Sequence, residues 1–200
     1  MKIGNPIIPQ SVLKKARKDS AKVLQAQVYE SIQREFNIIK EQMIRDFLNL
    51  PVTQEIMGGS DSPNISSTLV GGGNLFGFIG FERSDKPIEP ILDLLESSSI
   101  TIREGADHLV TITIPSAASI FSVTPMPWAS GRSWAKGIES GISGLGFYIA
   151  KSGVGRSTAG VQSTKKVKSG TFKRTQYIST FIQKYIKQFS SIKSSQLNLK

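Results

Sequence analysis

An apolar stripe at helical spacing runs through the first quarter of the chain. Its members are Leu24, Val28, Ile32, Phe36, Ile39, Met43, Phe47 and Leu50. Their mean spacing of about 3.7 residues is close to that of a straight α-helix and above the roughly 3.5 of a left-handed coiled coil. The pattern predicts one helix from about Ser11 to Leu50, ended by Pro51.

The length of this helix constrains every possible fold. Forty residues at about 1.5 Å each make roughly 60 Å, which is more than the width of a 200-residue domain. The helix therefore either breaks near Asp19 and Ser20, or projects from the domain and packs against neighbours. Because residues 14–18 are polar and basic, we expect that end to be exposed.

The next region is rich in glycine. Residues 51–73 are rich in Gly, Ser, Pro and Asn and predict a long loop. Residues 74–81 (NLFGFIGF) then predict a strand that is apolar on both faces, with Gly77 and Gly80 allowing another backbone to approach closely. A strand covered on both faces in so small a chain suggests that a second molecule supplies part of the cover. A short helix is expected over residues 88–95.

The rest of the chain alternates between strand and helix patterns. Residues 99–103 and 108–114 are β-branched and predict a hairpin. Further along we expect a strand or helix over 117–123, a helix over 132–141, a strand over 145–150, a mobile or partner-ordered loop over 151–172 and an amphipathic helix over 177–192. The predicted class is α+β: a long N-terminal helix, a small antiparallel or mixed β-sheet packed with one or two helices, and a basic C-terminal helix.

Three segments follow from these elements. Residues 1–50 form an arm and the long helix, residues 51–150 form an α+β core domain, and residues 151–200 form a basic loop and the C-terminal amphipathic helix.

Positive charge is concentrated at the C-terminal end. Residues 1–139 carry 14 basic and 15 acidic side chains, whereas residues 140–200 carry 11 basic and none that is acidic. A segment of one sign favours binding to a polyanion or to an acidic protein surface. The candidate contacts are Lys165, Lys166, Lys168, Lys173 and Arg174, either with DNA phosphates or with an acidic neighbouring subunit.

The sequence offers little for catalysis. It has no cysteine, which excludes disulfides, thiolate metal sites and thiol chemistry, and His108 is its only histidine. The glycine clusters fit neither a dinucleotide fingerprint nor a P-loop. We therefore expect no enzyme, no cofactor and no metal site. No apolar run is long enough to span a bilayer, and Pro6 and Pro9 interrupt any signal peptide, so we expect a protein made in a cytosol.

Three stretches carry a resemblance to a known family. They are residues 67–69 entering NLFGFIGF, residues 85–91 (DKPIEPI) and residues 127–149 (PWASGRSWAKGIESGISGLGFYI). Over residues 60–190 the chain resembles the head–tail connector, neck and tail-completion proteins of tailed bacteriophages, broadly the HK97-gp10-like minor tail proteins. The resemblance implies a structural virion protein, assembled in the host cytoplasm, that forms a ring of six copies in the phage neck and joins the head or portal to the tail.

The partners implied are other copies of the chain, other neck, portal or tail proteins, and packaged DNA. We expect residues 51–73 and 151–175 to be docking loops, and four aromatic side chains to be the apolar anchors of the interface: Phe76, Phe78, Trp128 and Trp134. Two alternatives stay open, a basic DNA-binding accessory protein outside a virion ring, and a tail-terminator or tail-tube subunit.

Overall fold

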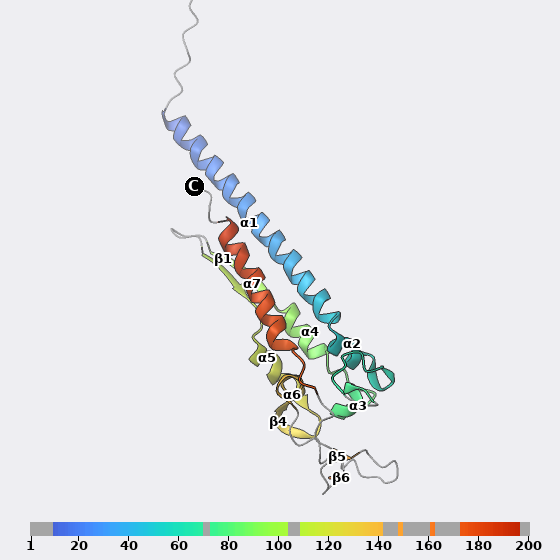
Figure 1. The fold of residues 1–200 in the computed structure, drawn as a ribbon. Helices are drawn as coiled ribbons and strands as arrows, with labels where there is room; N and C mark the ends of the chain where they lie inside the picture. Colours follow the sequence, from blue (N-terminus) through green and yellow to red (C-terminus); the bar gives the residue numbers. More distant parts are fainter. Residues whose placement is uncertain are drawn as a thin grey trace, which may run out of the picture.

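The computed structural model describes residues 10–69, 73–103, 109–141, 148–149, 161–162 and 173–196. Its helices are α1 (Gln10–Leu48), α2 (Pro51–Met57), a short 3-10 helix η1 (Gly59–Asp61), α3 (Leu75–Ile79), α4 (Glu89–Glu96), α5 (Ala117–Ser122), α6 (Trp134–Ser140) and α7 (Ile178–Gln196). Its strands are β1 (Ser99–Arg103), β2 (Leu109–Thr113), β3 (Pro125–Met126), β4 (Ala129–Ser133), β5 (Tyr148–Ile149) and β6 (Val161–Gln162). The predicted α+β class is confirmed (Figure 1).

The strands make three separate two-stranded pairs instead of the one small sheet that we expected. Each pair is antiparallel: β1 with β2, β3 with β4, and β5 with β6. The β1–β2 hairpin has a regular register, from Ser99 opposite Thr113 to Arg103 opposite Leu109. Its isoleucine and valine side chains, Ile100, Ile102, Val110 and Ile112, are partly buried against the core, so the predicted hairpin is present and packs through this face.

Helix α1 is continuous, so the break considered near Asp19 and Ser20 does not occur. Neither residue is a glycine or a proline, and the helical penalty of Asp and Ser is only a few tenths of a kcal/mol. The helix extends far past the body of the molecule at its N-terminal end (Figure 1). The helix therefore projects from the domain, while its packing against neighbours stays a prediction.

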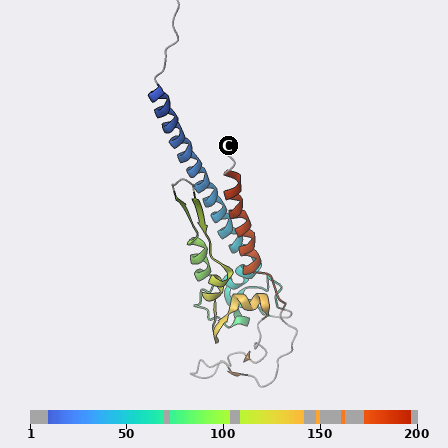
Figure 2. The same cartoon turned by 90° about the vertical axis from the view of Figure 1, so that its left-hand side faces the viewer.

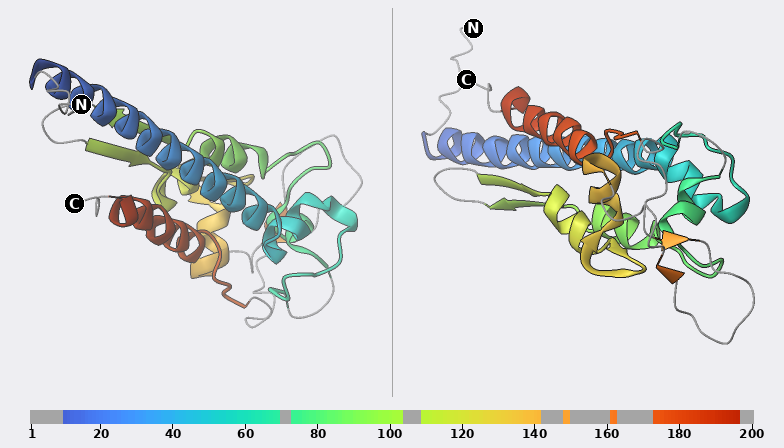
Figure 3. Two further views of the ribbon diagram at one scale, coloured as in Figure 1. Left: turned by 90° about the horizontal axis from the view of Figure 1, so that it is seen from above. Right: turned by 60° about the horizontal axis from the view of Figure 1, so that its bottom comes forward.

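The C-terminal half of α1 lies between α7 and the β1–β2 hairpin (Figures 2 and 3). Phe36 meets Phe189 with ring centroids 5.3 Å apart, and Phe47 meets Phe181 at 5.7 Å, so α1 and α7 run antiparallel. Phe47 also contacts Tyr177, with ring centroids 6.2 Å apart. This row of aromatic contacts, the aromatic seam, joins the α1–α7 pair to the globular end of the molecule. The predicted helix over 177–192 is confirmed as α7.

The strand expected over residues 74–81 is wrong, because Leu75–Ile79 form the helix α3 and Asn74 and Gly80 cap it. The Asn74 side chain accepts a hydrogen bond from the backbone N–H of Gly77 (2.9 Å), which is an N-cap. Gly80 has a φ of 90°, and the bonds Phe81 N–H to Phe76 O (3.2 Å) and Gly80 N–H to Gly77 O (3.1 Å) form a Schellman C-cap. The Phe76 and Phe81 rings, 5.3 Å apart, supply the hydrophobic contact of that motif.

The loop expected over 51–73 is also partly wrong. Pro51 does end α1, but it is also the first residue of α2, a position that suits proline because the N–H that it lacks has no helical partner there. The segment then forms η1 before it returns to α3. Residues 70–72 of this expected loop lie outside the described part of the chain.

The remaining predicted helices and strands agree better with the structure. The helix expected over 88–95 is α4, residues 117–123 form the helix α5 and not a strand, and the helix expected over 132–141 is α6. Of the last strand expected over 145–150, the described part is β5. Among the described helices, none combines the length and apolar character needed to cross a bilayer.

The glycines of α3 make its helical structure testable. A Cβ on Gly77 would meet only the Asn74 carboxamide oxygen, at an ordinary 3.5 Å, so Gly77→Ala should raise the free energy of unfolding by about 0.5–1 kcal/mol. A Cβ on Gly80 would lie 3.3 Å from Trp128 Cδ1 at a left-handed φ, so Gly80→Ala should lower it by more than about 1 kcal/mol. Urea unfolding of the two variants is the measurement.

Gly131→Ala is the matched control for Gly80→Ala. Its φ is 71°, but a Cβ there would meet nothing within 4 Å, so it isolates backbone strain from the contact with Trp128. If Gly77→Ala destabilised the protein and Gly80→Ala did not, this segment would not be a helix.

Candidate assembly interface

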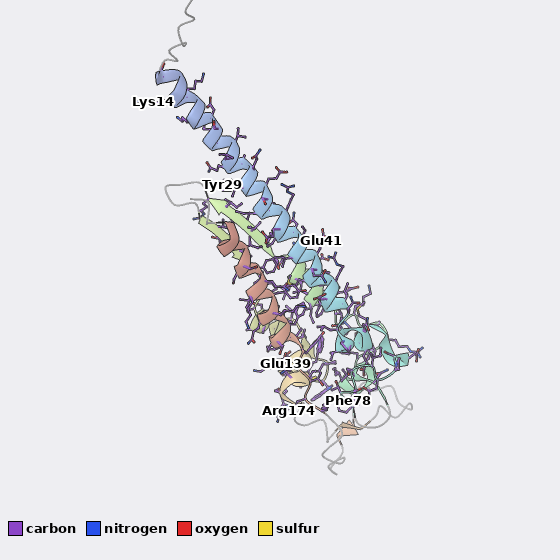
Figure 4. The ribbon with its side chains drawn as sticks, turned by 45° about the horizontal axis from the view of Figure 1, so that its top comes forward. Lys14, Tyr29, Glu41, Phe78, Glu139 and Arg174 are labelled. Atoms are coloured by element: carbon purple, nitrogen blue, oxygen red, sulfur yellow. The ribbon has the colours of Figure 1, made fainter. Side chains whose placement is uncertain are left out.

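The first half of α1 stands clear of the rest of the chain. From Ser11 to Gln27 the described side chains are exposed, apart from Gln25, which is half-buried and donates to the Tyr29 hydroxyl (2.7 Å). Burial on α1 begins with Val28 and is complete at Ile32 (5% exposed). Figure 4 shows Lys14 at the free end of the helix and Tyr29 close to where the hairpin meets it.

Apolar side chains are exposed along this helix. Leu24, which we counted as the first member of the buried stripe, is 61% exposed, Val23 is 58% exposed and Ile38, on the second half, is 63% exposed. Side chains that are this exposed contribute nothing to the core of a single chain. They are the apolar area that a second molecule would cover.

The second half of α1 is held by charged groups as well as by the aromatic seam. The Asp46 carboxylate accepts hydrogen bonds from Lys184 Nζ and the Tyr185 hydroxyl of α7, both at 2.6 Å. These two bonds, that of Lys184 first, lower the pKa of Asp46 to about 2. On the other side, Lys40 Nζ donates to the carbonyls of Glu96 and Ser98 (2.9 Å for the latter), where it caps the C-terminus of α4.

The globular end is organised around two carboxylates that sequence reasoning missed. Glu55 is fully buried and accepts from the backbone N–H of Ser66 (2.8 Å) and of Leu75 (2.7 Å), so it ties the middle of the segment between α2 and α3, and the first residue of α3, to α2. Glu139 of α6 accepts from the backbone N–H and the hydroxyl of Ser179, both at 2.6 Å. A carboxylate at the first turn of α7 satisfies free N–H groups and complements the helix dipole.

The buried Asn74 adds a third polar anchor. Besides capping α3, its side-chain amide donates to the carbonyls of Gly59 (3.0 Å), Ser60 (2.9 Å) and Ser62 (2.7 Å). The turn signals of residues 58–64 were visible in the sequence. The residue that binds three of their carbonyls, 12 to 15 positions further along the chain, had no local signal.

The four predicted apolar anchors divide into two pairs. Phe76 and Trp134 are 4% and 1% exposed and belong to the core of their own chain, so the expectation that they face a partner is wrong for this structure. Phe78 and Trp128 are half-buried. Trp128 Nε1 donates to the Ile79 carbonyl at 2.8 Å, which satisfies one of the free carbonyls at the end of α3.

Three of the five predicted basic contacts, Lys165, Lys166 and Lys168, lie outside the described residues. Lys173 and Arg174 are exposed at the entry to α7, and the Lys173 backbone N–H donates to the Thr68 carbonyl (2.8 Å). The Arg174 guanidinium lies beside Gly141 at the end of α6, close to Glu139 in Figure 4. The structure thus places two of the five predicted contacts, and it places them on the surface.

Comparison of the chain with protein families, with curated proteins and with solved structures finds no match. In the described part of the chain, no group of three or more His, Cys, Asp or Glu side chains is arranged to hold a metal ion. Two exposed surfaces of the described residues have been set out above: the projecting half of α1 and the basic entry to α7.

The Asp46 cluster gives a pH-dependent prediction. Because the folded-state pKa lies near 2 and an unfolded aspartate has a pKa of about 3.9, the cluster stabilises the fold above about pH 4, and this stabilisation is lost as the pH falls toward 2. Wild type should therefore be more stable than Asp46→Asn at pH 6, and the difference should shrink steadily between pH 4 and pH 2. Urea unfolding at a series of pH values measures this.

Glu41→Gln is the control, since the ion pair of Glu41 with Arg45 on the same helix is exposed. It should keep the pH dependence of the wild type. A gap between wild type and Asp46→Asn that is unchanged at pH 2 would show that the carboxylate's charge does not stabilise the contact between α1 and α7.

Proposed function

We propose that this chain is a structural subunit of the neck of a tailed bacteriophage, where its copies form a ring that joins the head or portal to the tail. The subunit acts by geometry and carries out no reaction. Its partners are further copies of itself and the neighbouring neck, portal or tail proteins, and its place is in the virion.

The observation that carries this proposal is the projecting half of α1. An isolated helix of this length is of low stability in water, and here it is extended from a packed helix that has already met the cost of nucleation. Its Val23 and Leu24 are 58% and 61% exposed in the described part of the chain. A helix arm of this kind suits a subunit whose structure is completed by a neighbour, as in a ring with heterologous contacts.

The anchoring of the arm also supports the proposal. The second half of α1 is fixed by aromatic contacts to α7, by the Asp46 cluster and by the cap from Lys40 to α4. An arm that is rigid at its base presents its free half at a defined angle. A defined angle is what a closed ring with a fixed number of subunits needs.

The second candidate is a DNA-binding accessory protein outside a virion ring. The observation that favours it is the exposed pair Lys173 and Arg174 within a C-terminal region that has no acidic side chain. Non-specific DNA binding draws on such exposed basic groups and weakens steeply with salt.

Light scattering of the purified protein at low and high salt, with negative-stain microscopy of the same sample, separates the two. The proposed function predicts particles of a discrete multiple of 21.8 kDa that look like rings. A monomer that binds duplex DNA tightly, and releases it as salt is raised, would contradict the ring and favour the second candidate.

A further inference from the structure

A basic stripe runs along one side of the projecting half of α1. Lys14, Lys18 and Lys22 are spaced by four residues, so they lie on the same side of the helix. All three are exposed, and none takes part in any ion pair or hydrogen bond of the described residues. The stripe is about 12 Å long, from the helical rise over eight residues.

This stripe continues the side of α1 that is buried further down. Lys14 precedes Ile32, and Lys18 precedes Phe36, by eighteen residues, which is five turns of a helix. Ile32 and Phe36 are buried at 5% and 2% exposure. The packing side of α1 therefore changes from apolar to basic where the chain's own cover ends, and the surface that fits it must be acidic.

An acidic stripe of similar length lies on α4. Glu89, Asp93 and Glu96 are spaced by four and three residues, are exposed, and face away from the buried Ile91 and Leu95. Seven residues of helix give about 10 Å. Glu89 is paired with Lys86 (2.7 Å), whereas the Asp93 and Glu96 carboxylates make no ion pair in the described residues.

The two stripes of one chain do not meet. The C-terminus of α4 is capped by Lys40. Lys40 lies eighteen residues after Lys22 on the same continuous helix, which corresponds to about 27 Å. The acidic stripe that the lysines contact must therefore belong to another molecule.

We propose that the basic stripe of one copy docks on the acidic stripe of the next copy, which makes a head-to-tail contact between subunits. The two surfaces match in charge and in length. Because the contact joins two different surfaces, it repeats from copy to copy and closes into a ring when the rotation allows. This inference rests on the proposed function and names the surfaces through which that function operates.

Charge exchange tests the contact. Lys18→Glu with Lys22→Glu, and separately Asp93→Lys with Glu96→Lys, should each raise the concentration needed for assembly by about tenfold or more, because two attractive pairs become repulsive. An equimolar mixture of the two double variants should restore assembly, since the basic α4 of one then meets the acidic α1 of the other. Lys136→Glu with Lys187→Glu is the control, and it should assemble as the wild type does; light scattering over a concentration series reads out all of them.

Cross-linking gives a second readout. The chain has no cysteine, so Lys18→Cys and Asp93→Cys introduced into separate copies provide unique thiols. A short bis-maleimide should join these two copies, and it should not join Lys136→Cys to Asp93→Cys. Assembly of the wild type should also weaken at about 1 M salt, where the Debye length is about 3 Å.

The outcomes separate the contact from the proposed function. Rings that form equally well from every double variant would overturn the contact and leave the ring in place. A wild-type chain that stays monomeric at all concentrations would overturn the contact and remove the main support for the ring. A Lys18→Glu, Lys22→Glu variant that assembles normally but binds duplex DNA less tightly would overturn the contact and assign the basic stripe to DNA.

Discussion

The antiparallel contact between α1 and α7 is the interaction on which the rest of the structure depends. It joins the two ends of the described chain, and its rings run from Phe36 and Phe189 through Phe47 to Tyr177, which contacts Trp134 at 6.2 Å. Aromatic pairs of this kind are each worth about 0.5–1.5 kcal/mol beyond the area that they bury. Without this seam α1 would keep its smaller contacts with α2, α4 and β1, and the entry to α7 would lose its place on α6.

Buried polar groups set how the globular end is connected to that seam. Tyr177 is buried and shares a hydrogen bond with Thr53 of α2 (2.9 Å), and burial raises the pKa of its hydroxyl, which stays protonated at neutral pH. Glu139 fixes the start of α7, and Glu55 fixes the start of α3. Each group is costly to bury without partners and, once paired, allows one arrangement of the segments that it joins. The second half of α1 is thus held rigidly, while the side chains of its first half are exposed.

Sequence reasoning succeeded where one helical or strand period decided the structure, as in α1, α4, α7 and the β1–β2 hairpin. It failed at α3 because an alternation of period two was weighed above the cap residues: Asn74, Gly80 and the Phe76–Phe81 pair all signalled a short capped helix. It failed at Pro51 because the proline was treated only as a stop. The roles of Glu55, Glu139 and Asp46 depend on partners at least eleven residues away, and no local pattern marks them.

The central claim is that the two parts of α1 have different roles: residues 32–47 pack within the chain, and residues 10–27 bind a neighbouring copy. Hydrogen–deuterium exchange by mass spectrometry, on the monomer and on the assembled protein, tests it most directly. The account predicts that residues 10–27 exchange quickly in the monomer and slowly in the assembly, while residues 32–47 are protected in both, because the arm lacks tertiary contacts that the base has. Equal protection of residues 10–27 in the two states would contradict it.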